Sequence, residues 1–432
     1  MELNTRLANS LQLLRCFWLS KLHLPRGVVP SLEEEEVSER DLRLTLLNDV
    51  ATLLCTGENG RSLAVTMENT EDGLRLTLAT AAYPLDSERE AADKLFRLLQ
   101  DEKTNMESLF NTAVCSGMER VKRFIEEVKK NLELFPLMSL IDEVKPWRRC
   151  EEEIPMVSRA RELCGAEISL PPADLLKRLF IALREQINSL VGIITPETIR
   201  DTIMLAQVYR VSCLCDIVGR SRFFRRVTRL NHFEPFSHHA ASLMSALLVL
   251  GRYSGAATRL SKRVRNIRQP ISYVWDTAIA APPAPKELVL HPTAYEALRA
   301  GDYVEATSGE ERDADEAMVE SEFKDASWEN RVTVFLHPEL RLILLAKDTT
   351  ERILGISDDL CFSCKRWIEY YNESTERKWI VRPGLDVPDP TWMYPQQHPL
   401  EQQIEPLVSE WTDTLVHFRL GGLTFRRALL LW

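Results

Sequence analysis

The alternation of strand and helix patterns in residues 331–384 constrains the fold more than any other stretch of the sequence. Short apolar or β-branched runs at 332–336, 352–356 and 378–382 are typical of buried strands. The longer patterns between them are helical, and their predicted starts are Pro338 and Cys361. The order strand, helix, strand, helix, strand indicates a layered α/β arrangement, and sites in such folds usually lie where strands pass into helices.

Four side chains suited to metal binding or proton transfer lie at those two junctions. His337 directly precedes Pro338, a residue favoured at the first helical position, so His337 is expected to cap the helix. Cys361 and Cys364 are three residues apart, which places both thiols on one face of a first helical turn, where the helix dipole favours thiolate. One imidazole and two thiolates leave a fourth position for water, as in catalytic Zn²⁺ sites. Glu339 lies two residues after His337 and could transfer a proton.

The motif H-P-E, followed after 21 residues by C-F-S-C, resembles the His-x-Glu and Cys-x-x-Cys pattern of the zinc-dependent cytidine-deaminase-like superfamily. The run I-L-G-I-S before the cysteines and the aromatic helix after them look most like a deaminase-like branch abundant in fungal genomes. The resemblance implies that His337, Cys361 and Cys364 bind Zn²⁺ and that Glu339 is the proton shuttle. It also implies a three-layer α/β domain with a mixed central sheet, and a hydrolase that deaminates a nucleobase, nucleoside, nucleotide or nucleic acid.

Two other interpretations of the same motif remain open. A degenerate deaminase-like protein could keep the fold and a structural zinc site as a catalytically inactive scaffold engaged in protein contacts. Cys361 and Cys364 could instead serve thiol redox chemistry, because a lone C-x-x-C motif also occurs in redox proteins. A zinc assay separates the redox interpretation from the other two, and a Glu339 variant separates the enzyme from the scaffold.

The rest of the chain is predicted to be mostly helical, which makes the whole an α+β protein. Apolar residues recur at helical spacing through most of the first half, and the strong β signal there is a hairpin with strands at 62–67 and 73–80. We therefore predict a mostly helical domain with one β-hairpin at 1–255, a deaminase-like zinc domain at 256–390 and a C-terminal helical tail at 391–432.

The composition is that of an ordinary globular protein of a reducing, intracellular compartment, either cytoplasm or nucleus. The 432 residues suffice for two or three domains, and 45% of them are hydrophobic against 27% charged. The nine cysteines are odd in number and scattered, so we expect free thiols instead of disulfides. No apolar run reaches the ~18 residues that span a bilayer, and the N-terminus lacks a secretory pattern, so we expect no membrane association.

A basic stretch stands out in a chain whose net charge is −10. Between Asp216 and Pro270 there are 11 Lys or Arg residues against 2 Asp or Glu. Aromatic residues among the arginines would suit phosphate contacts to single-stranded nucleic acid, but the same pattern also fits solvated helix faces that balance acidic flanks. The partners we expect are therefore a base-containing small molecule or a single-stranded nucleic acid, and the sequence does not identify a protein partner of the helical domain. The candidate phosphate-binding residues are Arg225, Arg226, Arg263 and Arg265.

Overall fold

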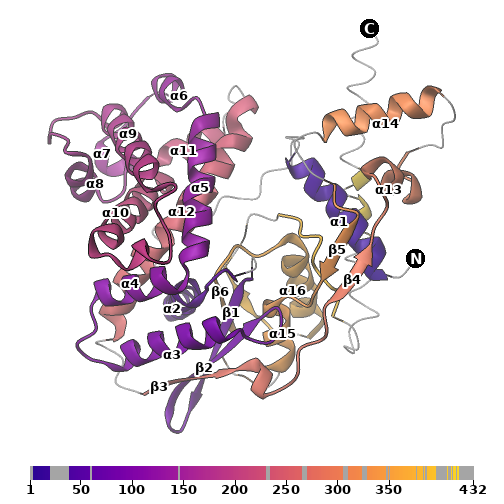
Figure 1. The fold of residues 1–432 in the computed structure, drawn as a ribbon, viewed down its shortest axis with the longest axis horizontal. Coiled ribbons are helices and arrows are strands. Elements are labelled where there is room, and N and C mark those ends of the chain that lie inside the picture. Colours follow the sequence, from indigo (N-terminus) through magenta and orange to yellow (C-terminus); the bar gives the residue numbers. More distant parts are fainter. Residues whose placement is uncertain are drawn as a thin grey trace.

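The computed structural model defines an α+β protein that is mostly helical, with a mixed five-stranded sheet and a separate two-stranded sheet (Figure 1). The fold class predicted from the sequence is confirmed. The structure describes residues 3–19, 38–58, 61–144, 146–229, 234–264, 270–304, 310–323, 328–346, 349, 351–375, 377–382, 384, 387–395, 406, 410, 412–414 and 416–417.

The five-stranded sheet has the order β3-β2-β1-β6-β7. Its centre is the predicted hairpin, whose antiparallel strands pair Leu63 with Thr80 at one end and Thr70 with Gly73 at the turn. Strand β6 runs antiparallel to β1, whereas β3 is parallel to β2 and β7 is parallel to β6. The strands are β1 (Leu63–Thr70), β2 (Gly73–Thr80), β3 (Ile271–Trp275), β6 (Ile353–Ile356) and β7 (Ile380–Val381).

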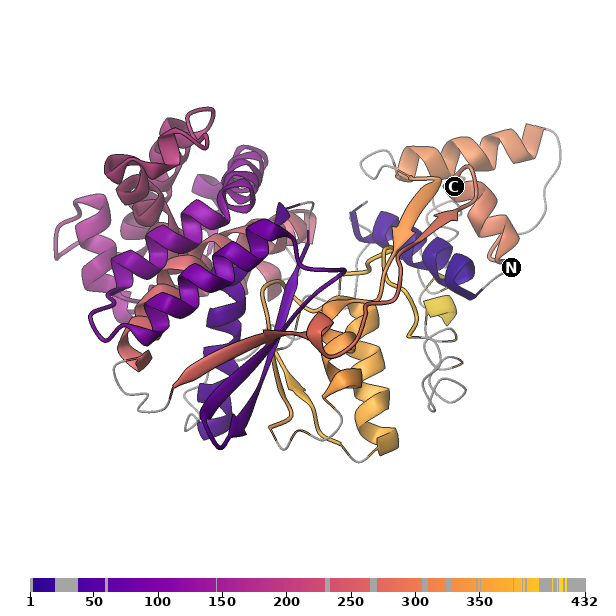
Figure 2. The same ribbon diagram turned by 60° about the horizontal axis from the view of Figure 1, so that its bottom comes forward.

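Helices cover both faces of this sheet, which gives three layers, and the layers include α2, β1 and β2 from the first half of the chain. Helix α2 (Glu39–Leu54) packs on one face against β1 and β6. Helix α15 (Pro338–Leu345) packs on the other face against β1 and β2, and α16 (Phe362–Thr375) shares its apolar core. Figure 2 shows α2 and the orange helices α15 and α16 on opposite sides of the sheet.

The side chains of the central strands divide between these two faces in the alternation expected of a strand. Val65 packs in the core shared with α2, whereas its neighbour Ala64 packs in the core shared with α15 and α16. Gly355 of β6 faces α2, and a Cβ at this position would lie 2.3 Å from the carbonyl carbon of Leu47. The small residue at 355 therefore allows the close approach of α2 to the sheet.

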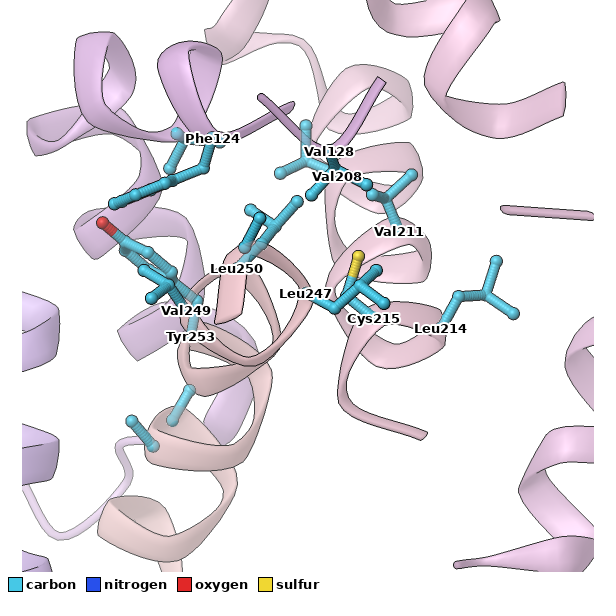
Figure 3. Packing of buried hydrophobic residues seen from close by; sticks show 14 of the residues in the cluster. Phe124, Val128, Val208, Val211, Leu214, Cys215, Leu247, Val249, Leu250 and Tyr253 are labelled. Atoms are coloured by element: carbon cyan, nitrogen blue, oxygen red, sulfur yellow. The ribbon is translucent and has the colours of Figure 1, made fainter. Parts of the chain in front are cut away.

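A helical layer extends the core on the α2 side. The buried face of α5, α10 and α12 is lined by Val128, Leu214, Leu250 and similar residues (Figure 3). These helices are α3 (Asp86–Gln100), α4 (Met106–Ser116), α5 (Met118–Leu134), α6 (Leu137–Glu143), α7 (Cys150–Glu153), α8 (Val157–Cys164), α9 (Pro172–Leu190), α10 (Thr202–Gly219), α11 (Arg222–Arg229) and α12 (Glu234–Val264).

Helix α10 is the only described helix that is long and apolar enough to span a membrane by composition, but 67% of it is buried inside the protein. It packs against α9 and α12, so its apolar sequence is accounted for as a core helix. The nine cysteines are all free, as expected from their scattered positions.

A further lobe combines the N-terminal helix with segments from the second half of the chain (Figure 1). Its small core joins Leu13 and Leu14 of the first helix to Tyr295, Leu298 and Phe323. The lobe contains α1 (Leu3–Leu19), α13 (Ala294–Ala300), α14 (Glu310–Glu322) and the antiparallel pair β4 (Lys286–Val289) and β5 (Arg331–Val334).

This packing bears on the predicted domains without fixing their boundaries. Helix α1 and the β1–β2 hairpin both belong to the predicted helical segment 1–255, yet they pack with elements of segment 256–390. Strand β5, which opens the metal motif, pairs with β4 outside the five-stranded sheet. The limits at 255 and 390 stay predictions, and the helical tail predicted at 391–432 lies largely outside the described residues.

Candidate metal centre

His337, Cys361 and Cys364 converge at the junctions of β5 with α15 and of β6 with α16. His337 Nδ1 lies 3.6 Å from the sulfur of Cys361 and 3.4 Å from that of Cys364, and one ligand atom from each residue lies within 4.8 Å of the other two. Ligands at about 2.0–2.3 Å from a tetrahedral ion are separated by similar distances. The predicted convergence is confirmed, and the donor set of one nitrogen and two sulfurs could hold a metal ion.

His337 caps the helix that begins at Pro338, as the sequence predicts. His337 occupies the N-cap of α15 with extended backbone angles, φ −61° and ψ 144°, and Pro338 is the first helical residue. The imidazole is buried and stacks on the Phe335 ring, with 5.1 Å between the ring centroids. These contacts fix the ring so that Nδ1 points towards the two thiols.

Helix α15 is anchored to the sheet by a buried arginine. Arg341 donates from Nη1 to the carbonyl oxygen of Thr80 at 2.7 Å and forms an ion pair with the buried Asp276, which follows β3. Because Arg341 lies one turn after His337 on the same helix, these contacts set the position from which the imidazole reaches the thiols.

The thiols lie at the start of α16, as predicted. The backbone N–H of Cys364 donates to the Cys361 sulfur at 3.4 Å. Burial acts to raise the pKa of Cys361, but Cys364 and the His337 ring lower it to about 6, whereas burial and the neighbouring Cys361 raise the pKa of Cys364. One thiolate is therefore favoured by the fold itself, and a bound cation would favour the second.

Glu339 lies in the first turn of α15 with only 6% of its surface exposed. Its Oε2 atom has no hydrogen-bond partner among the residues that the structure describes. Burial, opposed by His337 and assisted by Cys361, raises the pKa of Glu339 to about 7. A buried carboxyl with a near-neutral pKa beside a metal-ligand set is suited to accept and donate a proton.

Asp389 also lies at the site, although it is outside the H-P-E and C-F-S-C motif. Its Oδ2 atom lies 3.6 Å from Nε2 of His337, the ring nitrogen on the side away from the thiols. Its Oδ1 atom accepts hydrogen bonds from the backbone N–H and the hydroxyl of Thr391 at 2.9 and 2.7 Å. At this distance Nε2 of His337 has no hydrogen-bond partner among the described residues. A carboxylate that accepts a hydrogen bond from a metal-binding histidine orients the ring and increases its basicity, and Asp389 is the carboxylate placed to do so.

The segment that carries Asp389 reaches His337 through backbone pairing with the end of β5. Phe335 donates its N–H to the Thr391 carbonyl at 2.9 Å, and Met393 donates to the Phe335 carbonyl at 3.0 Å. The spacing of Asp389 and Thr391 is typical of a turn capped by a side chain, so the local sequence predicts a turn here. That signal gives no indication of which distant residue the turn approaches.

The structure does not place the candidate phosphate-binding arginines beside the metal-ligand set. Arg225 and Arg226 lie on α11, which packs on α12 and α7 in the helical layer, away from α15 and α16 (Figure 1). Arg226 forms an ion pair with the buried Glu153 and donates to the Pro146 carbonyl at 2.7 Å.

The other two candidate phosphate-binding residues are Arg263 and Arg265. Arg263 of α12 donates to the Leu42 carbonyl at 2.7 Å, which is a contact within the protein. Arg265 falls outside the described residues. Arg226 and Arg263 bind groups within the protein. The solvated-face interpretation and the phosphate interpretation both stay open for the arginines of this stretch.

The comparisons with known proteins add no family to this description. No family model matches the chain, and the searches of curated proteins and of solved structures found no match. The geometry shows one histidine and two cysteines that could hold a metal ion, with the buried Glu339 in the same helical turn and Asp389 on the far side of the histidine ring.

Proposed function

We propose that the protein is a zinc-dependent hydrolytic deaminase that acts on an amino-substituted base, free or within a nucleoside, nucleotide or nucleic acid. The convergence of His337, Cys361 and Cys364 carries the proposal. Two thiolates and one imidazole suit Zn²⁺, and three protein ligands leave a fourth position free, which distinguishes catalytic from closed structural sites.

The position of Glu339 supports an enzyme over a purely structural centre. A structural site needs no titratable carboxyl, and burying one without a hydrogen-bond partner costs free energy. Glu339 is nevertheless buried next to the ligand set, and its free Oε2 atom has no partner in the described part of the chain. Retention of such a group is expected where it transfers protons.

The chemistry follows from these positions. When bound, Zn²⁺ would supply Lewis-acid activation of a water molecule. Glu339 would accept a proton from that water at its carboxyl group and return it to the departing amine. A carbon–oxygen bond forms at the amine-bearing ring carbon, the carbon–nitrogen bond breaks, and ammonia leaves. Asp389 would hold the His337 ring in its ligating orientation during this sequence.

A catalytically inactive scaffold with a structural metal is the second candidate. It is favoured by the burial of the ligands, since Cys364 is fully buried and Cys361 and His337 are no more than 9% exposed. In that case the metal would stabilise the junction of the sheet with α15 and α16, and no base would be turned over.

The test combines metal content with ammonia release from a panel of bases, nucleosides, nucleotides and single strands. Glu339→Gln removes the titrating group and keeps the size, so zinc content and melting temperature should stay near those of the parent. Deamination should fall by about 10²–10⁴-fold, the usual contribution of a general acid–base group. Glu373→Gln, an exposed carboxyl on α16, is the matched control and should retain activity.

Cys361→Ala tests the metal centre separately. Zinc should be lost and stability should fall, whereas Cys115→Ala, at an exposed thiol on α4, should change neither. Full zinc binding by a parent that releases no ammonia from any member of the panel would favour the scaffold. If the purified protein binds no zinc even when zinc is supplied, the result would favour the redox interpretation of Cys361 and Cys364.

A further inference from the structure

Four arginines meet where α12 passes the carboxyl ends of β6 and β7. Arg252 and Arg259 lie on α12, Arg220 follows α10, and Arg382 follows β7. Three of them have a carboxylate partner. Arg252 Nη2 lies 2.6 Å from Asp359, Arg259 binds Asp49 through two nitrogens at 2.6 and 2.9 Å, and Arg220 Nε lies 2.7 Å from Asp216.

Arg382 is the member of this cluster that lacks its own carboxylate within the described part of the chain. The like charge of Arg252 first, and burial second, lower the pKa of Arg382 to about 10. Asp359 acts in the opposite direction, but it already binds Arg252. Arg252 itself is only 9% exposed, and its Nε atom has no hydrogen-bond partner among described residues.

Asp359 therefore acts on two partly buried guanidinium groups but contacts only that of Arg252, and the second carboxylate that acts on Arg252, Asp358, is already paired with Arg120. This arrangement is unfavourable in the absence of a further anion, because a buried charge without a partner costs free energy. Arg220 borders the cluster, and its own side chain is 37% exposed. Among the described residues, the four arginines of the cluster have three carboxylate partners, Asp359, Asp49 and Asp216.

The position of the cluster connects it to the metal centre. Asp359 lies two residues before Cys361 on the same loop. The chain that follows Arg382 runs along this loop, since a Cβ on Gly384 would lie 2.3 Å from the Leu360 carbonyl oxygen, and Phe362 donates its N–H to Val387 at 3.1 Å. Because β6 and β7 are parallel, their carboxyl ends share one edge, which is where ligands of α/β sheets usually bind.

We propose that Arg382 and Arg252, bordered by Arg220, form a binding site for a phosphate group. Arginine presents a planar fork of donors that matches phosphate oxygens, and the unpaired Nε of Arg252 and the uncompensated charge of Arg382 would both be satisfied by such an anion. The inference deepens the proposed deaminase function and rests on it in one respect: the substrate is then a phosphorylated one, a nucleotide or a strand, in preference to a nucleoside or free base.

Binding of inorganic phosphate by calorimetry and by thermal shift tests the site without relying on turnover. The full-length parent should bind phosphate and gain melting temperature with its concentration. Arg382→Gln should weaken binding by about tenfold or more, since a hydrogen bond to a charged group is lost. Arg331→Gln, at an arginine of β5 whose side chain is 71% exposed, should bind as the parent does.

A second variant keeps the test valid if Arg382→Gln affects folding. Arg382→Lys retains the charge but not the fork, so it should bind phosphate more weakly than the parent and more tightly than Arg382→Gln. In the absence of phosphate, Arg382→Gln should melt no lower than the parent, because the repulsion from Arg252 is removed. Equal phosphate affinity in the parent and Arg382→Gln, or no binding by the parent, overturns the site.

The source of the phosphate is resolved by comparing nucleosides, nucleoside monophosphates and short single strands in the inactive Glu339→Gln background. If monophosphates bind more tightly than their nucleosides, and this difference in affinity is lost in Arg382→Gln, the substrate is a mononucleotide. If single strands show a larger gain in affinity than monophosphates, the site binds a phosphodiester. Equal binding of nucleosides and monophosphates overturns the substrate inference. The zinc-loaded parent could bind phosphate through Arg382 and yet release no ammonia. That result would support the anion site and refute the deaminase proposal.

Discussion

The guanidinium of Arg120 donates to the carboxylate of Asp358 at 2.7 Å and joins the helical layer to the loop that carries the two candidate metal-binding cysteines. Arg120 belongs to α5 and its side chain is fully buried, and it also donates to the Ser357 carbonyl at 2.9 Å. Asp358 lies three residues before Cys361. This contact holds the β6–α16 loop from the opposite side of the sheet to α15.

Arg120→Met should destabilise the protein and loosen the metal-bearing loop. Removal of one partner of a buried pair costs about 3–5 kcal/mol, and the lower end applies because Asp358 is 36% exposed. Urea unfolding measures the loss, and zinc retention during dialysis against a chelator measures the loosening. Arg123→Met, at an exposed arginine on the same helix, should change the free energy of unfolding by no more than about 0.5 kcal/mol.

The same pair predicts a dependence of stability on acid pH. Burial acts to raise the pKa of Asp358, but Arg120, followed by Ser357 and Arg252, holds it below its usual value. A carboxyl whose pKa is lower in the folded than in the unfolded state contributes stability above its unfolded pKa of about 3.9, and the contribution is lost as the pH falls through the folded value. The free energy of unfolding should therefore fall more steeply below pH ~4 in the parent than in Asp358→Asn; parallel curves would contradict this origin.

Asp389→Asn should weaken metal binding although Asp389 is not one of the three ligands. Loss of the carboxylate behind a ligating histidine typically reduces metal affinity about 10–100-fold. Competition with a chromophoric chelator measures the affinity. Asp313→Asn, at an exposed carboxylate on α14, provides the comparison and should leave it unchanged. An unaltered affinity in Asp389→Asn would show that Phe335 and the N-cap geometry suffice to orient the ring.

Arg226→Gln should destabilise the helical layer more than it affects any ligand. The variant leaves the carboxylate of Glu153, whose side chain is fully buried, without its guanidinium partner, which costs about 3–5 kcal/mol. It also removes the guanidinium from the Trp147 ring, 5.5 Å away. Thermal unfolding of Arg226→Gln beside Arg222→Gln, an exposed neighbour on α11, measures the difference; equal melting temperatures would refute the structural role.

Arg225→Gln tests the predicted contact with single strands. If phosphates bind along this helix, the variant should bind strands more weakly and with a smaller salt dependence. Unchanged binding in a folded variant would assign Arg225 to a solvated face.

Much of the metal centre follows from sequence because its determinants are local. Proline after His337 sets a helix start, and the i, i+3 spacing of Cys361 and Cys364 sets the direction of both thiols. The strand and helix pattern of 331–384 predicts each of the five elements found there. Propensity, capping and periodicity act over a few residues, so they can be read without knowledge of distant contacts.

The tertiary structure alone decided which distant segments complete the site. Asp389 reaches His337 through the bridge to Phe335, Arg120 of the helical layer reaches Asp358 on the β6–α16 loop, and Arg252 of α12 acts on the charge of Arg382 after β7. The hairpin at 63–80 lies between β3 and β6 in the sheet. The alternation of apolar and polar residues predicts the two strands of the hairpin but not the strands that pair with them. The physical reason is that strand pairing, ion pairing and burial depend on which surfaces meet after the chain has closed long loops, and the local sequence carries little information about that choice.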